Sequence, residues 1–196
     1  MKLKISVILA LFAVFATLNS CRCNIHYLEL SKTQQQMIPY ELGQTINFVD
    51  SVGKKFDVVV ISDTTYWENP IVYHYNCEIY REYREVTLRS DSENLEIALT
   101  IYGEAKEIDN LSLIISIAQS DIVIKYFTLG YDKKGRFRNY ESYFGSQNLY
   151  ERFEINSHVY CEVLENQFSF YVIYFNKTYG ILQIKIKDEI IFTIDN

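Results

Sequence analysis

A chain of 196 residues, 48% of them hydrophobic and 22% charged, has enough apolar material for one buried core and too much for intrinsic disorder. Its formal net charge of −6 argues against a nucleic-acid partner, because such binding needs clustered lysine and arginine. The same acidic balance argues against a domain that lies flat on anionic lipid.

Residues 1–20 have the pattern of a secretory signal peptide. Lys2 and Lys4 form a basic head, and residues 5–18 are an almost unbroken apolar run. This run is shorter than the roughly 20 residues that a transmembrane helix needs. It ends at Leu18-Asn19-Ser20-Cys21, which resembles the lipobox of bacterial lipoproteins. The resemblance implies cleavage before Cys21 and attachment of lipid to its thiol.

Residues 21–37 are predicted to be a lipidated tether, because their apolar periodicity is weak, and residues 38–196 a single β-rich domain. An extended tether would reach up to about 50 Å and hold the domain clear of the lipid headgroups. Loss of two lysines with the signal peptide lowers the formal charge from −6 to −8. Arg22 follows Cys21 where an aspartate would be the usual signal for inner-membrane retention. We therefore expect an outer-membrane lipoprotein that faces the periplasm, with surface display as the alternative.

Strict alternation of apolar and polar residues predicts strands that have one face on a core. It occurs at residues 95–101, 111–117, 182–186 and 190–194, and it places Gln183 on the face toward water. Residues 58–61 and 168–175 are apolar on both faces and are predicted to be strands covered twice. The repeated Tyr-Arg-Glu triplet at residues 80–85 leaves a helical turn open, but the alternation that follows it favours a strand.

Turn residues separate these segments, as in Asp50-Ser51-Val52-Gly53 and Asn176-Lys177. Their spacing and the lack of a helical stripe predict an all-β fold of about ten strands. A single antiparallel meander, a sandwich and a partly closed barrel all fit this pattern.

Both ends of the predicted domain resemble a family. Residues 174–186, with Tyr179-Gly180 after a polar turn and a last strand at 190–194, resemble the C-terminal hairpin of small uncharacterised cell-envelope lipoproteins of Bacteroidetes. Residues 40–48, followed by Gly53, resemble their first hairpin. The resemblance implies a β-rich envelope lipoprotein, and it supplies no catalytic residue and no cofactor.

Motifs for catalysis or metal binding are sparse. The sequence has no nucleophile elbow, no His-Glu-x-x-His and no glycine-rich phosphate loop, and its three histidines lack metal-ligand spacing. We therefore expect no cofactor, no metal site and no enzyme. The carboxylate pairs Glu82/Glu85 and Glu162/Glu165 would serve a hydrolase only if the fold brought them together.

Two kinds of covalent modification are candidates besides the lipid. Cys77 and Cys161 would meet an oxidising compartment after export, where a disulfide persists, and two buried free thiols are the alternative. The segments Asp50-Ser51-Val52 and Asp63-Thr64-Thr65 match the short O-glycosylation pattern of Bacteroidetes, which makes Ser51 and Thr64 candidate sites. Ordinary turns use the same residues.

Aromatic residues are in excess, with 17 Tyr, 12 Phe and one Trp. Tyr66 and Trp67 stand in a predicted polar loop that ends at Pro70, and there they face a ligand or cap the end of a sandwich. The favoured function is a binding module for a glycan, peptide or protein. A lipocalin-like or carrier-like binder of an apolar ligand is the alternative, and a hydrolase is less favoured. A filled interior would favour the module, and a cavity of several hundred Å³ the carrier.

Overall fold

The computed structural model describes residues 25–68, 71–73, 77–103, 110–119, 122–132, 136–138, 146–186 and 189–195. Most of them lie in strands, and the one helix among them, α2 (Lys32–Gln35), is a single turn. The strands are β1 (His26–Leu28), β2 (Thr45–Asp50), β3 (Lys55–Trp67), β4 (Ile71–Tyr73), β5 (Cys77–Ser90), β6 (Leu95–Gly103), β7 (Asn110–Gln119), β8 (Ile122–Asp132), β9 (Phe137–Arg138), β10 (Ser146–Ile155), β11 (His158–Phe168), β12 (Tyr171–Asn176), β13 (Gly180–Ile186) and β14 (Glu189–Ile194).

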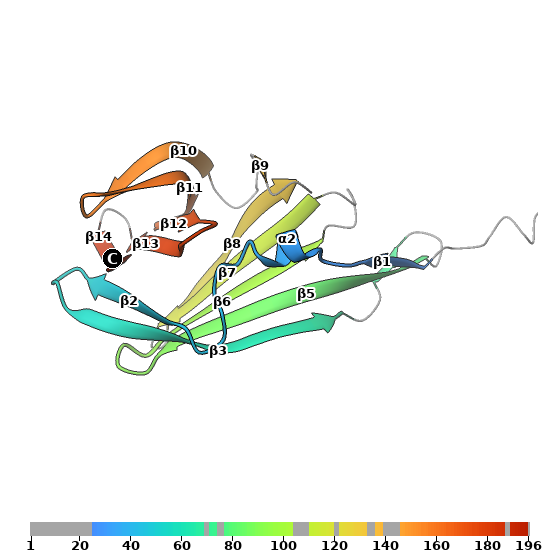
Figure 1. Cartoon of the computed structure of the whole chain (residues 1–196), viewed down its shortest axis with the longest axis horizontal. Coiled ribbons are helices and arrows are strands. Elements are labelled where there is room, and N and C mark those ends of the chain that lie inside the picture. Colours follow the sequence, from blue (N-terminus) through green and yellow to red (C-terminus); the bar gives the residue numbers. More distant parts are fainter. Residues whose placement is uncertain are drawn as a thin grey trace, which may run out of the picture.

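All of these strands belong to one sheet. Its order is β10-β11-β12-β13-β14-β2-β3-β5-β6-β7-β8-β9, and β1 and β4 pair with β5 outside this path. Every neighbouring pair is antiparallel except β1 and β5, which are parallel. The sheet curls into a half-barrel, so that β11 comes close to β8 (Figure 1). The predicted all-β fold with about ten strands and a partly closed barrel is confirmed.

The core lies inside the curl and follows from the alternation along the central strands. On β6, Leu95, Ile97, Leu99 and Ile101 are buried, whereas the residues between them are partly exposed. On β7 the interior residues Leu113, Ile115 and Ile117 pair with this row. Each such side chain contributes roughly 1.5–3 kcal/mol of transfer free energy.

The C-terminal strands differ from the prediction in two places. Residues 168–175 are not one strand, because Ser169 turns the chain with a positive φ of 54° between β11 and β12. Gln183 does not face water. It is buried and donates a hydrogen bond to Thr193 Oγ1 at 2.9 Å, since this part of the sheet is covered on both faces. Tyr174, its cross-strand neighbour, is buried as well.

The segment between β1 and β2 belongs to the domain, which differs from the expected tether at residues 21–37. β1 pairs with the first part of β5, and α2 starts at Ser31 with a capping box that Gln34 completes. Leu30 and Met37 are buried in the common core. These contacts make residues 26–40 part of the packed structure.

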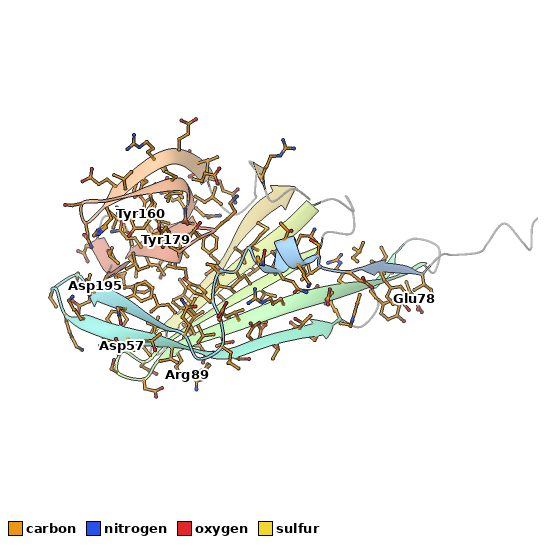
Figure 2. The ribbon with its side chains drawn as sticks, viewed as in Figure 1. Asp57, Glu78, Arg89, Tyr160, Tyr179 and Asp195 are labelled. Atoms are coloured by element: carbon orange, nitrogen blue, oxygen red, sulfur yellow. The ribbon has the colours of Figure 1, made fainter. Side chains whose placement is uncertain are left out.

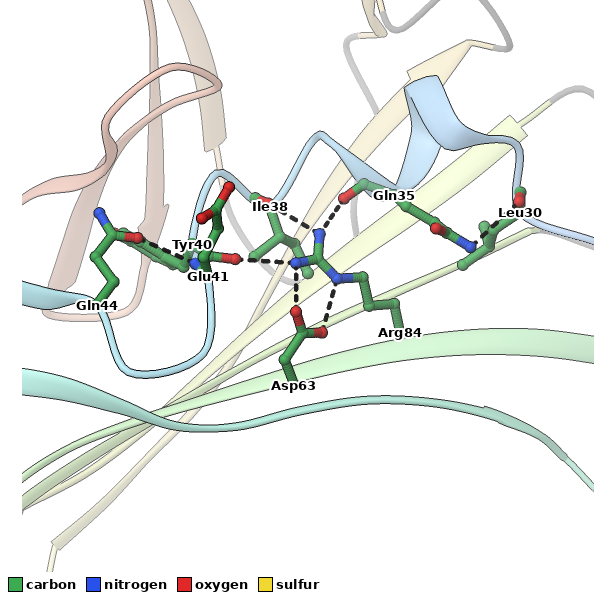
Figure 3. A network of polar contacts seen from close by, with 8 residues as sticks. All are labelled: Leu30, Gln35, Ile38, Tyr40, Glu41, Gln44, Asp63 and Arg84. Carbon is green, nitrogen blue, oxygen red and sulfur yellow. Dashed lines mark hydrogen bonds and ion pairs between the residues drawn. The ribbon is translucent and has the colours of Figure 1, made fainter.

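Arg84 on β5 holds this segment against the sheet (Figure 3). Its guanidinium forms a two-pronged ion pair with Asp63, with both N–O distances at 2.9 Å. It also donates to the backbone carbonyl oxygens of Gln35, of Ile38 at 3.0 Å and of Tyr40 at 2.9 Å. All five N–H groups of the guanidinium are therefore used.

Tyr40 links the same segment to the other half of the sheet. Its ring is buried, and its hydroxyl accepts a hydrogen bond from the Ile181 N–H at 2.6 Å. Burial raises the pKa of the Tyr40 phenol. Gly180 leaves room for this ring, because a Cβ there would lie 2.0 Å from the Tyr40 hydroxyl.

Candidate binding site

One side of β3 is unpaired along half of the strand. β2 pairs with β3 only between Lys55 and Val59, and Val60 still exchanges backbone hydrogen bonds with Gly43 and Gln44. Residues 61–67 pair with β5 on one side and with no strand of the described chain on the other. We call residues 61–67 the open edge.

The direction of the backbone groups along the open edge follows from the neighbouring strand. Past the bulge between Val60 and Ser62, the Glu68 N–H donates to the Arg81 carbonyl oxygen at 3.0 Å. Backbone groups alternate in direction along a strand, so those of the even-numbered residues point to β5. The odd-numbered residues 63, 65 and 67 therefore direct their N–H and C=O groups to the unpaired side.

The strand at one end of the sheet, β10, is different from the open edge, which lies in the middle of the strand order. β10 exposes Glu151, Arg152 and Glu154, and charged side chains on an edge discourage pairing with another chain. The open edge of β3 has one charged residue, Asp63, and Arg84 neutralises it. The open edge thus lacks the charges that usually protect a free strand.

Tyr66 and Trp67 lie on β3, not in the predicted loop, and alternation places them on opposite faces of the sheet. Tyr66 stacks on Tyr83, with ring centroids 5.5 Å apart, and Tyr83 stacks on Tyr102 at 5.0 Å. The Tyr83 hydroxyl donates to Glu68 Oε2 at 2.6 Å, and burial together with this bond raises its pKa. These rings form a row across β3, β5 and β6.

Trp67 belongs to a second cluster, on the face of Asp63 and Arg84. The Tyr27 ring meets the indole edge-on at 5.7 Å and stacks on Tyr80 at 5.1 Å. The Tyr80 hydroxyl donates to Glu78 Oε2 at 3.1 Å, and this bond raises the pKa of Tyr80. We call Tyr27, Trp67 and Tyr80 the aromatic tip, because β1 and the start of β5 form one end of the molecule (Figure 1). The two predicted ligand-facing aromatics therefore belong to different surfaces.

The predicted modification sites are placed as follows. Cys21 lies outside the described residues. Cys161 is exposed on β11 with a free thiol, and Cys77 is in β5 with a side chain outside those described, so a disulfide between them stays a prediction. Ser51 is exposed in a turn in which Asp50 Oδ1 accepts hydrogen bonds from two backbone N–H groups. Thr64 is exposed on the open edge. O-glycosylation of either remains a prediction.

The carboxylate pairs are not brought together. Glu82 Oε2 accepts from the Leu30 N–H at 2.6 Å, whereas Glu85 lies on the opposite face of β5 and accepts from the Thr100 hydroxyl at 3.4 Å. The members of the other pair are also engaged separately: Glu162 pairs with Lys177, and Glu165 accepts hydrogen bonds from Asn148 and Tyr150. Neither pair faces a common space.

Buried side chains occupy the part of the half-barrel interior that the described residues line. Buried side chains from the central strands, the C-terminal strands and the N-terminal segment form one hydrophobic cluster. Cavities of about 400 and 270 Å³ lie beside the turn between β5 and β6, where Arg89, Ser90 and Asp91 line both. They are open and mostly polar, which does not suit an apolar ligand.

Comparison with protein-family models, with curated proteins and with solved structures finds no match for this chain. In the part of the chain that the structure describes, no helix is long and apolar enough to cross a membrane. The same residues include no group of three or more His, Cys, Asp or Glu side chains placed to hold a metal ion.

Proposed function

We propose that this chain is an exported outer-membrane lipoprotein, anchored by lipid on Cys21 and facing the periplasm. Its domain is a binding module that takes an extended peptide segment of a partner protein along the open edge of β3. The proposed location is supported by the resemblance of residues 18–21 to a lipobox and by Arg22 after the cysteine. The mode of binding comes from the open edge, and this unprotected strand is the observation that carries the proposal.

An added strand would complete the backbone hydrogen bonding of β3. The N–H and C=O groups of Asp63, Thr65 and Trp67 point to the unpaired side and would bond to the main chain of the peptide. Tyr66 is exposed beside it, so side chains of the peptide on that face would meet an aromatic ring. Main-chain bonds would supply affinity, and the Tyr66 ring specificity.

The carrier alternative has less support than the binding module. A carrier of an apolar molecule needs a dry interior space, and the described interior side chains occupy it. The glycan alternative has less support as well, because the rings of Tyr66, Tyr83 and Tyr102 stack on one another and do not form a flat platform. An extended peptide needs only the strand edge.

The experiment uses peptides selected from a random library on residues 21–196, with binding measured by titration calorimetry. Thr65→Pro removes an outward-pointing N–H and leaves the ladder to β5 intact, because edge strands tolerate proline. Thr65→Ala is the matched control, since it removes the same side chain and keeps the N–H. We expect the selected peptides to bind the wild type and Thr65→Ala alike and to lose at least about tenfold in affinity for Thr65→Pro, which corresponds to about 1.4 kcal/mol.

Two results would overturn the mode of binding. One is the failure of any peptide to be enriched on the folded domain. The other is equal affinity of the selected peptides for Thr65→Pro and Thr65→Ala, with circular dichroism showing that both variants are folded.

A further inference from the structure

The aromatic tip lies close to the point at which the chain would leave the membrane. β1 begins at His26, so only residues 22–25 stand between it and Cys21. Five consecutive Cα–Cα steps span at most about 18 Å, whatever conformation they take. An unpaired tether over residues 21–37 would have allowed a distance of up to about 50 Å between the lipid and the domain. The pairing of β1 with β5 and the contacts of Arg84 hold most of that segment against the sheet, so the distance is shorter. The lipid on Cys21 would therefore hold this end of the domain at the membrane surface.

The side chains at this end suit the region between water and hydrocarbon. Tyr27 is 60% exposed, Trp67 44% and Ile25 54%. Tyrosine and tryptophan are enriched at the level of the lipid headgroups, because an apolar ring and a polar N–H or O–H are both accommodated there. Exposed aromatic rings grouped at the membrane-proximal end would gain apolar contact with lipid that they do not have in water.

The charges nearby indicate the kind of lipid. Glu78 and Glu68 each accept a hydrogen bond from a tyrosine, and Glu82 accepts one from the Leu30 backbone. These carboxylates would repel an anionic surface and have no such conflict with zwitterionic headgroups. Arg81, which lies opposite Leu28 of β1 at this end, is outnumbered by these three carboxylates, so attraction through charge is not what holds the tip.

We propose that the aromatic tip docks into the zwitterionic headgroup layer of the membrane that carries the lipid on Cys21. This inference rests on the lipid anchor of the proposed function and adds an orientation to it. β5 runs from the tip to the turn after Ser90, a distance of about 45 Å at the usual rise per strand residue. Docking through the tip would place that turn, Tyr160 and Tyr179 far from the bilayer, at the end of the molecule opposite Glu78 (Figure 2).

The test uses the fact that Trp67 is the single tryptophan of the chain. The lipidated protein is purified from membranes, its intact mass is measured, and it is reconstituted into phosphatidylcholine vesicles that contain a headgroup spin-labelled lipid. We expect a blue shift of Trp67 emission on reconstitution and strong quenching by the spin label. The matched control is the double variant Trp67→Phe, Tyr179→Trp, which moves the indole to an exposed position at the far end. Its quenching should be weaker by at least about twofold.

A third variant separates docking from mere nearness. Tyr27→Asp puts a charge into the exposed part of the tip and should lower the quenching of Trp67 while leaving the circular dichroism spectrum unchanged. If the mass shows lipid and Trp67 is quenched no more than the distant indole, docking is wrong and the lipoprotein proposal stands. If the mass shows no lipid on Cys21, the anchor and the docking inference fail together.

Discussion

Arg84 is the side chain whose loss should weaken the fold most directly. Arg84→Met keeps a long apolar stem and removes the guanidinium, so three backbone carbonyl oxygens and the Asp63 carboxylate lose their donors. Each partly buried carbonyl left without a donor costs about 1 kcal/mol. The carboxylate is 26% exposed, so water repays part of its loss and it adds about 1 kcal/mol. The total is about 4 kcal/mol, a large share of the roughly 5–15 kcal/mol that stabilise a typical domain.

The assay is urea unfolding of residues 21–196, followed by circular dichroism. With a slope of about 2 kcal/mol per molar urea, the midpoint of Arg84→Met should fall by about 2 M. Hydrogen exchange should show that the amides of residues 30–40 open first, because the guanidinium holds that segment. Arg89→Met is the matched control on the same strand. Its ion pair with Glu96 is solvent-exposed, and its midpoint should not move measurably.

Equal midpoints for Arg84→Met and Arg89→Met would refute this reasoning. So would a large loss of stability without faster exchange in residues 30–40, because the cost would then arise elsewhere. The double variant Arg84→Met, Asp63→Asn gives an internal check: its loss should be smaller than the sum of the two single losses, since both remove the same ion pair.

Further predictions concern single residues of the core and the anchor. Gly180→Ala should destabilise the domain far more than Gly53→Ala in urea unfolding, because both glycines have positive φ but only a Cβ at Gly180 meets the Tyr40 ring. Tyr40→Phe should make the decrease in unfolding free energy between pH 8 and pH 11 smaller than in the wild type. Burial raises the pKa of Tyr40, so its contribution is complete below the unfolded-state value near pH 10 and is lost above it, where the unfolded chain releases the proton first. Urea midpoints at pH 8 and 11 measure this difference, and parallel pH curves for both proteins would contradict it. Cys21→Ala should abolish labelling by a fatty-acid probe and leave the circular dichroism spectrum unchanged, and lipid label on this variant would disprove the proposed anchor.

The strands that could be predicted are those whose signal is local. In β6 and β7 every second residue is apolar because one face packs on the core, and this pattern is visible without knowledge of the neighbours. The turn at Ser169 is hidden, because apolar residues run on through it from β11 into β12. The alternation predicts that Gln183 is a surface residue. It is buried because both faces of the sheet are covered at this position, which the sequence pattern does not show.

The N-terminal segment was harder to predict for a different reason. Leu30 and Met37 are buried because Arg84 and Glu82, about fifty positions later, hold the intervening backbone. The spacing of Ser31 and Gln34 does match a capping box, and this local signal could have indicated the helical turn. For the candidate site, the sequence indicates that Tyr66 and Trp67 are prominent. It does not indicate which strands are neighbours, so neither the open edge nor the meeting of Tyr27 with Trp67 could be predicted.

The large sequence separation of the Tyr40 contact also determines how late in synthesis the domain can finish folding. The hydroxyl of Tyr40 meets a residue 141 positions later, and β2 pairs with β14, the last strand. Contacts of such separation form late, because the entropy of a long loop must be lost before they repay it. A nascent chain stalled before residue 180 should accordingly be digested readily by protease. A protein made N-terminus first would thus keep an unfinished core until its final strands emerge, and it would stay loose enough to be threaded through a narrow translocation channel.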